Sequence, residues 1–263
     1  MKRSLSLSGK NWSLLHGDCI AVMDSLPAES VDLVFADPPY NLSNDGMTCI
    51  NGKWESVNKG SWDRSRGVSG DFTFHQRWIQ SCSRVLKQNG AIWISGTYHS
   101  IYSCAFALQT GGWAILNDIC WYKKNAPPNL SCRFFTASHE TLIWAKKSKK
   151  ARHTFNYAAM KADTGSTDSL KKPHKQARSV WSYAPASQHE KRYGKHPTQK
   201  PEALLERVVA ATTSEGQVIL DPFCGSGTTG VAALRLGRSF LGIDTDRGYL
   251  ERIASRRLAV EEH

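Results

Sequence analysis

The sequence lacks several features that mark common protein classes. Its apolar runs stay well short of the ~20 residues that a membrane-spanning helix needs, so we expect no membrane partner. The start, MKRSLSLSGKNW, is basic but lacks the apolar segment of a secretory signal, which makes a cytoplasmic protein the expectation. The seven cysteines are scattered without a CxxC pair, which argues against a disulfide framework and against structural zinc. We expect no metal site.

Acidic residues are scarce in one contiguous third of the chain. Residues 121–200 hold 17 Lys/Arg but only 4 Asp/Glu, more than enough to account for the whole net charge of +11. Trp, Tyr, Phe, His and Asn are interleaved with the basic residues. Such a stretch is typical of a polyanion-binding surface, so nucleic acid is the expected partner. A merely solvated face is the alternative, although such a face normally mixes both signs of charge.

What the sequence does contain is a regular alternation of strand-like and helix-like segments. Short apolar runs predict strands at 13–19, 31–36, 91–96, 113–124, 142–147, 218–221 and 239–244. Helical spacing of apolar residues predicts helices between most of them, including 72–90 and 200–213. This order is typical of an α/β protein with a mostly parallel sheet. Residues 41–70 and 158–195 are polar and without period, and we predict mobile loops there.

The stretch VDLVFADPPYNLSN ends a buried strand in an unusual way. Two prolines remove two backbone donors and fix φ, so the strand stops at Asp37. The turn that follows holds a carboxylate, a stiff backbone carbonyl and the aromatic face of Tyr40 close together. A simple strand-terminating turn with a capping Asp is the alternative interpretation.

The most regular unit of the sequence is GQVILDPFCGSGTTGVAALRLGRSFLGIDTD. A strand, a glycine turn at Gly225 and Gly227, a helix that begins at Thr228 and a second strand predict a nucleotide-binding βαβ unit. Asp221 at the turn would repel a pyrophosphate, which disfavours a dinucleotide. A nucleoside with a cationic arm fits better, with Asp221 near an ammonium group and Asp244 on the ribose. That ligand is S-adenosylmethionine (SAM).

With DPPY, DPFCGSGTTG and KHPTQKP in this order, the chain resembles the β-group of DNA amino-methyltransferases over residues 12–258. The segments at 126–157 and 56–63 look most like the DpnA-like methyltransferases of bacterial restriction–modification systems, which modify adenine in GATC. Relatives that modify GANTC look similar, so GATC is a hypothesis. The resemblance implies a single domain over 1–263 with a seven-stranded, mostly parallel Rossmann-like sheet, circularly rearranged. One strand is antiparallel, and a basic target-recognition insertion spans 125–195.

The resemblance also implies roles for individual residues. The catalytic motif comprises Asp37, Pro38, Pro39 and Tyr40. The residues expected to bind SAM are Asp18, Cys19, Asp37, His196, Thr198, Lys200, Asp221, Phe223, Gly225, Gly227, Thr228 and Asp244. Within this set, Gly17-Asp18-Cys19 is expected beside the SAM adenine, and Thr198 and Lys200 at the methionine carboxylate. Asp37 and the Pro38 carbonyl would accept the two N–H groups of the adenine amino group, and Tyr40 would stack on a base flipped out of the DNA.

Further residues are expected to contact DNA. Those expected mainly at phosphates are Lys146, Lys147, Lys149, Lys150 and Arg152. Arg133 and Asn129 are better placed by the resemblance for base edges. The sequence leaves open whether the DNA is double- or single-stranded. The sequence does not reveal the oligomeric state, although relatives often form homodimers. The resemblance implies a cognate restriction endonuclease that acts on the same site without direct contact.

Other functions stay open from the sequence alone. N4-cytosine methylation is the nearest alternative, but that subgroup usually has Ser where this chain has Asp37. A dehydrogenase-like Rossmann protein would leave the DPPY motif unexplained. A DNA-binding protein that keeps SAM only as an effector would not be expected to retain Asp37.

Overall fold

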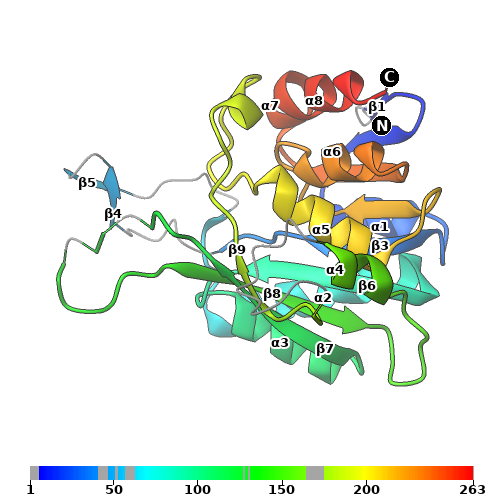
Figure 1. The fold of residues 1–263 in the computed structure, drawn as a ribbon, viewed down its shortest axis with the longest axis horizontal. Coiled ribbons are helices and arrows are strands. Elements are labelled where there is room, and N and C mark those ends of the chain that lie inside the picture. Colours follow the sequence, from blue (N-terminus) through cyan, green and yellow to red (C-terminus); the bar gives the residue numbers. More distant parts are fainter. Residues whose placement is uncertain are drawn as a thin grey trace.

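The computed structural model describes residues 6–40, 47–50, 53–56, 63–126, 128–129, 131–163 and 175–262. Within these ranges, every helix is too short or too polar to cross a bilayer. Two structural layers of helices enclose one twisted sheet, as Figure 1 shows.

The central sheet has nine strands in the order β1-β2-β11-β10-β3-β6-β8-β7-β9. Its strands are β1 (Ser6–Ser8), β2 (Trp12–His16), β3 (Val31–Ala36), β6 (Leu86–Gly96), β7 (Ala114–Tyr122), β8 (His139–Lys146), β9 (Val180–Ser182), β10 (Val218–Asp221) and β11 (Ser239–Asp244). The five neighbouring strands β2, β11, β10, β3 and β6 run parallel, whereas β8 is antiparallel to both of its neighbours. The predicted seven strands with one reversed strand are therefore confirmed, and the short strands β1 and β9 extend the sheet at its two edges.

The helices cover both faces of the sheet. They are α1 (Cys19–Ser25), α2 (Val68–Val85), α3 (Ile101–Thr110), α4 (Tyr157–Ala162), the 3-10 turn η2 (His189–Lys191), α5 (Glu202–Thr212), α6 (Thr228–Arg235), α7 (Arg247–Tyr249), the wider turn η3 (Leu250–Ala254) and α8 (Ser255–Val260). Helices α1, α2 and α3 supply buried side chains to one hydrophobic cluster, and α5, α6 and α8 supply them to the other. A parallel sheet is stable only when both faces are covered in this way.

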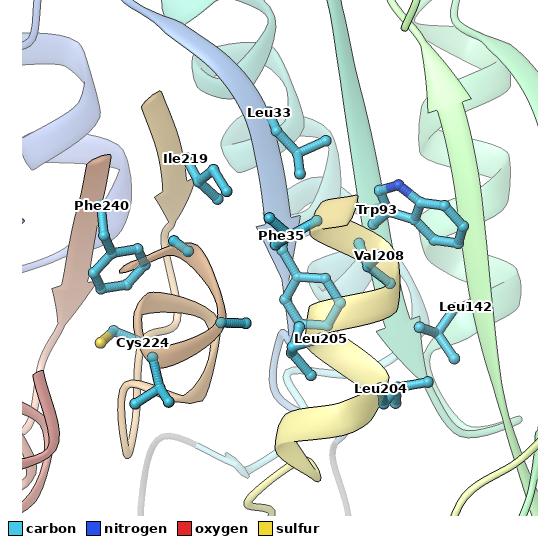
Figure 2. Packing of buried hydrophobic residues seen from close by; sticks show 14 of the residues in the cluster. Leu33, Phe35, Trp93, Leu142, Leu204, Leu205, Val208, Ile219, Cys224 and Phe240 are labelled. Atoms are coloured by element: carbon cyan, nitrogen blue, oxygen red, sulfur yellow. The ribbon is translucent and has the colours of Figure 1, made fainter. Parts of the chain in front are cut away.

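Apolar spacing explains how α5 attaches to the sheet. Leu204, Leu205 and Val208 recur at helical spacing and are fully buried. Figure 2 shows them facing Phe35 of β3 and Trp93 of β6. Burial of each such side chain contributes about 1.5–3 kcal/mol to folding. The α5 helix therefore fixes the segment that precedes it, KHPTQKP, against the carboxyl ends of the strands.

Some sequence predictions need correction. Strand β6 begins at Leu86, so the helix expected over 72–90 ends before Gly90. Strands β4 (Met47–Ile50) and β5 (Lys53–Ser56) form an antiparallel hairpin within the predicted loop 41–70. Residues 41–46, 51–52, 57–62 and 164–174 lie outside the described residues, so the prediction that 41–70 and 158–195 are mobile stays a prediction there.

The second predicted loop is attached to the sheet. Strand β9 pairs in parallel with β7, and the buried Trp181 of β9 packs under the guanidinium of Arg207, 4.4 Å from its ring centre. The indole of Trp121 donates to the carbonyl of Tyr183 over 2.9 Å. These contacts hold residues 180–183 of the predicted insertion against the β7 edge of the sheet.

Candidate active site

The predicted site residues meet where the parallel strands end. Asp37 follows β3, Pro222 follows β10, Asp244 ends β11 and Gly17 follows β2. All four line one open cleft, the kind of concave site that small molecules usually occupy. Ligands of open α/β sheets bind outside the carboxyl ends of the strands, so the cleft lies where the fold class places it.

The DPPY turn is fixed by a residue that the sequence did not single out. The backbone N–H of Tyr40 donates to Asp63 Oδ1 over 2.8 Å, and Asp63 is fully buried. Pro38 is buried as well. Because two prolines stiffen the turn and Asp63 holds its end, Asp37 is placed before any ligand arrives.

Behind the turn lies a buried polar cluster made of Asp37, Tyr40, Lys123, Glu140 and Lys200. The Tyr40 hydroxyl lies 2.6 Å from Asp37 Oδ1 and 3.1 Å from Glu140 Oε2. Lys200 Nζ donates to Asp37 Oδ2 over 2.5 Å and to the Tyr40 hydroxyl over 2.8 Å. Glu140 also pairs with Lys123, and its Oε2 lies 3.7 Å from Lys200 Nζ. Two carboxylates thus balance two ammonium groups.

Burial and charge oppose one another in this cluster. Burial raises the pKa of Asp37, and Lys200 offsets only part of the effect. Burial would also raise the pKa of Glu140, but Lys200 and Lys123 outweigh it and lower that pKa. The pKa of Tyr40 is raised well above its ordinary value by burial and by the two carboxylates, so its hydroxyl stays protonated. Glu140 is therefore the firmly ionised carboxylate, and Asp37 is the carboxylate most sensitive to its surroundings.

The glycine turn after β10 allows close backbone approach. Gly225 and Gly227 have φ values of 51° and 75°, which favour glycine. A Cβ on Gly225 would lie 2.9 Å from Nε2 of His196, so the imidazole could not pack there. The N–H of Gly225 donates to Asp244 Oδ2 over 2.7 Å. The turn, the acid of β11 and the KHPTQKP segment are thereby locked together.

Asp221 serves the turn itself. Its Oδ1 accepts from the N–H of Phe223 over 3.0 Å, and its Oδ2 accepts from the Thr229 hydroxyl over 2.6 Å. Burial raises the pKa of Asp221 to about 7. The hydroxyl of Thr228 accepts from the Arg257 guanidinium over 2.9 Å. The side chains of Asp221 and Thr228 thus both stabilise the turn. The predicted contact of Asp221 with a ligand ammonium stays a prediction.

One wall of the cleft is apolar. Phe223 packs edge-on against Trp78, with ring centres 5.4 Å apart, and Phe74 lies beside them. Asp18 lines the same cleft and caps α1 by accepting from the N–H of Ala21 over 3.0 Å. Burial raises the pKa of the neighbouring Cys19 thiol to about 12, so this cysteine is a neutral wall residue. An aromatic base could lie flat between such surfaces.

The KHPTQKP segment closes the other end of the cleft. His196 packs edge-on against Tyr249, with ring centres 4.5 Å apart, and Thr198 lines the same space. The resemblance implied Lys200 at a methionine carboxylate. In the structure its ammonium pairs with Asp37 and lies 3.7 Å from Glu140 Oε2. The predicted contact with a methionine carboxylate stays a prediction.

Comparison with known proteins agrees with this arrangement. A family model described as DNA methylase matches residues 31–256. The type II methyltransferase M2.LlaDCHI of Lactococcus lactis subsp. cremoris is 49% identical over 250 residues, covering 95% of this chain and 90% of that protein. The type II methyltransferase M2.DpnII of Streptococcus pneumoniae is 49% identical, with 94% and 90% covered. This chain belongs to the DNA methylase family.

Solved structures place the methylase in the same fold. The M1.HpyAVI–SAM complex is 26% identical, with a TM-score of 0.66 over 94% of this chain and 98% of that one. The cytosine-N4-specific PvuII DNA methyltransferase has a TM-score of 0.69 at 16% identity, covering 97% and 92% of the two chains. The second likeness shows the fold alone, which this chain therefore shares with a cytosine-N4-specific enzyme.

The DNA-contact predictions divide into two groups in the methylase. Arg133 and Asn129 lie in the loop between β7 and β8, on the catalytic edge of the sheet. The other five predicted residues are Lys146, which ends β8, and Lys147, Lys149, Lys150 and Arg152, which follow it. Because β8 runs opposite to β6, this end lies at the far edge, roughly 20 Å from Glu140 at about 3.3 Å per residue.

Two lysines of the second group hold their own turn. Lys146 Nζ donates to the carbonyls of Lys149 and Ala151, and Lys147 Nζ donates to the carbonyl of Leu86. This turn lies at the edge of the sheet opposite to Asp37, and the Asn129 amide braces its own loop. The predicted DNA contacts of both groups stay predictions.

Sequence reasoning missed several residues of the site. They are Asp63, Arg66, Lys123, Glu140 and Tyr249. One signal was available for Glu140, because an acid within the apolar strand HETLIWAK has to find a partner when it is buried. Nothing local marked Asp63 or Tyr249.

Proposed function

We propose that this methylase transfers the methyl group of SAM to N6 of an adenine in DNA, within the sequence GATC. The observation that carries the proposal is the position of Asp37: a carboxylate and a stiff backbone carbonyl face the same cleft as the glycine turn and Asp244. The DpnA-like resemblance and the relative M2.DpnII support the choice of site.

The cleft fits SAM along its length. The apolar wall at Phe223 suits the adenine, and Asp244 keeps lone pairs for the ribose hydroxyls beyond its two backbone bonds. Thr198 and His196 remain for the methionine end. The neighbour M1.HpyAVI is a SAM complex, which supports SAM as the ligand. Bound there, SAM supplies an electrophilic methyl group.

The DPPY turn prepares the adenine amino group. Its nitrogen lone pair is delocalised into the ring, so the nitrogen is a poor nucleophile until its geometry becomes tetrahedral. Asp37 accepts one N–H and the Pro38 carbonyl accepts the other, which directs the lone pair and stabilises the charge that develops on nitrogen. Tyr40 is 4% exposed and has its hydroxyl fixed, so it offers a rigid ring beside the base.

Lys200 has to give up part of its contact with Asp37 during this step. In the structure its ammonium donates to Oδ2 and the Tyr40 hydroxyl donates to Oδ1, so both carboxylate oxygens already accept a hydrogen bond. Glu140 and the Tyr40 hydroxyl offer Lys200 a second position within the same cluster. A short shift toward Glu140 frees Asp37 without leaving a buried charge unpaired.

The choice of adenine over cytosine rests on Asp37, since the fold is shared with a cytosine-N4-specific enzyme. In the cellular setting we propose a cytoplasmic modification enzyme whose cognate endonuclease cuts the same site without touching it. A homodimer is part of the same proposal, because relatives of this group often dimerise.

The test is to express the methylase with plasmid DNA that carries no methylated bases and to identify and map the modified nucleosides. We expect N6-methyladenine confined to GATC. N6-methyladenine at another motif would contradict the site and keep the reaction. N4-methylcytosine would contradict the assignment of Asp37, and unmodified DNA, single- or double-stranded, would indicate a SAM-binding protein without catalysis.

A further inference from the structure

The loop between β7 and β8 grows directly out of the wall of the active site. Its base is closed where the N–H of Lys123 donates to the carbonyl of Ser138 over 2.8 Å. The ammonium of Lys123 pairs with Glu140 of the polar cluster. The loop therefore projects from the catalytic edge of the sheet, and Figure 1 shows it reaching away from the sheet on the side of β4 and β5.

The described part of the loop tip is braced by its own side chains. Asn129 Oδ1 accepts from the N–H and the hydroxyl of Ser131, over 3.0 and 2.8 Å. Its Nδ2 donates to the carbonyl of Phe134 over 2.7 Å, and its N–H donates to the Thr136 hydroxyl over 3.3 Å. The backbone that carries Phe134 and Phe135 is thereby held without help from the body of the protein.

This braced tip presents aromatic side chains to solvent. Phe135 is 97% exposed, more than any other large hydrophobic residue in the described part of the chain, and Phe134 is 66% exposed. Exposed aromatic rings on a braced loop that leaves the catalytic edge of the sheet are typical of a binding surface. They require a partner that the body of the protein does not supply.

The charge of the loop identifies the kind of partner. Residues 123–138 contain Lys123, Lys124 and Arg133 and no Asp or Glu. A cationic loop attracts a polyanion and repels a second copy of this basic chain. Aromatic rings that accompany such charges stack on nucleic-acid bases, because every base has an apolar π-face.

We propose that Phe135, with Phe134 beside it, inserts into the base stack of the DNA next to the target adenine. This proposal rests on the function proposed above. When the adenine turns out of the duplex, its neighbours lose a stacking partner, and an aromatic ring in the gap compensates for that loss. Arg133 at the same tip contacts the adjacent backbone or base edge, while the Asn129 brace keeps the ring in position.

The test compares Phe135→Ala, Phe135→Trp and a matched exposed aromatic on another element, Phe106→Ala of α3, which is 55% exposed. Each is given three oligonucleotides with the same target site: a fully paired duplex, a duplex with an abasic position opposite the adenine, and the single strand. Methyl transfer is measured under single-turnover conditions. Parallel duplexes carry 2-aminopurine at the target, whose fluorescence rises when it leaves the stack.

We expect Phe135→Ala to slow transfer on the paired duplex by about 10- to 100-fold, the range that one lost base–aromatic stack gives. On the abasic duplex and the single strand the loss should shrink to about threefold or less, because turning out an unpaired adenine costs little. The 2-aminopurine signal should fall in parallel, Phe135→Trp should retain it, and Phe106→Ala should match the unsubstituted protein. Thermal unfolding should be unchanged, since the ring is exposed.

Three results would overturn the proposal. The first is an equal loss on all three substrates, which means general DNA affinity. The second is unchanged transfer by Phe135→Ala on the paired duplex. The third is a lower molecular mass of Phe135→Ala in sedimentation, which means that the rings join two copies of the chain. If the unsubstituted protein methylates no DNA, the proposed function itself fails, and that outcome is distinct from the other three.

Discussion

Removing the charge of Glu140 should destabilise the methylase, because this carboxylate serves two buried lysines at once. Glu140→Gln keeps the volume of the side chain but leaves Lys123 and Lys200 to share Asp37 alone. Breaking a buried ion pair by removing one partner costs about 3–5 kcal/mol. Lys123 keeps 22% of its side chain exposed and can turn to solvent, so the lower end of about 3 kcal/mol applies.

The size of the effect can be measured by thermal unfolding. At about 2–3 °C per kcal/mol for a domain of this size, Glu140→Gln should lower the Tm by about 6–9 °C. Lys123→Met removes the more exposed ammonium and leaves Glu140 paired with Lys200, so its loss should be smaller. The double variant restores a balance of one carboxylate and one ammonium.

A double-mutant cycle then isolates the interaction. The two losses should not add: the double variant should recover about 1–2 kcal/mol of their sum, within the usual range for residues in one network. A Tm for Glu140→Gln within 1 °C of the unsubstituted protein would refute the balanced cluster. Strict additivity would refute the pairing of Lys123 with Glu140.

Three other predictions test the cofactor cleft and the DNA-facing edge. Burial raises the pKa of Asp221 to about 7, and a cationic ligand favours the charged carboxylate. SAM binding should therefore release protons and tighten from pH 6 to pH 8. Calorimetry in buffers of different ionisation enthalpy measures the proton release, and binding without proton release would contradict the prediction. Gly225→Ala should weaken SAM binding about tenfold. A left-handed φ costs about 1–2 kcal/mol in a non-glycine residue, and the new Cβ displaces the His196 imidazole. Unchanged affinity would show that the turn can relax. DNA affinity is measured by fluorescence anisotropy with a duplex. The double variant Lys149→Ala/Lys150→Ala should stay within about twofold of the unsubstituted affinity, whereas Arg133→Ala should weaken binding about five- to tenfold. The reverse order would indicate that DNA binds at the lysine turn.

The pH effect follows from the sign of the Asp221 shift. A carboxyl whose pKa is higher in the folded protein than in the unfolded chain holds its proton longer in the fold, so it disfavours folding as pH rises from about 4 to about 7. Above pH 7 the free protein carries an ionised and buried carboxylate. A bound cation reduces that penalty, so SAM binding should tighten as the pH rises through 7.

Local sequence signals predicted the nucleotide-binding unit correctly. Strands β10 and β11 and helix α6 lie where the pattern of apolar residues and glycines placed them, because a strand, a tight turn and a helix are specified by neighbouring residues. The two prolines likewise ended β3 at Ala36. These elements carry Asp37 and Asp244 to the same edge of the sheet, as the parallel order requires.

Long-range contacts were beyond such signals. Glu140 approaches Tyr40 across 100 positions of sequence, and Lys200 approaches Asp37 across 163. The position of the lysines at the end of β8 was beyond such signals for a related reason: charge content says nothing about the direction of a strand, and β8 runs opposite to its neighbours. A basic segment was therefore divided between two opposite edges of the sheet.

The central claim is that Asp37 directs methyl transfer to adenine N6 in DNA. The most direct measurement is single-turnover transfer of labelled methyl from SAM to a duplex with one GATC, by the unsubstituted methylase and by Asp37→Asn, with SAM binding measured for both. We predict label in N6-methyladenine for the unsubstituted protein, and at least a hundredfold slower transfer by a variant that still binds SAM, because the carboxylate that stabilises the developing charge is gone. Label in cytosine, or equal rates for the two proteins, would contradict the account.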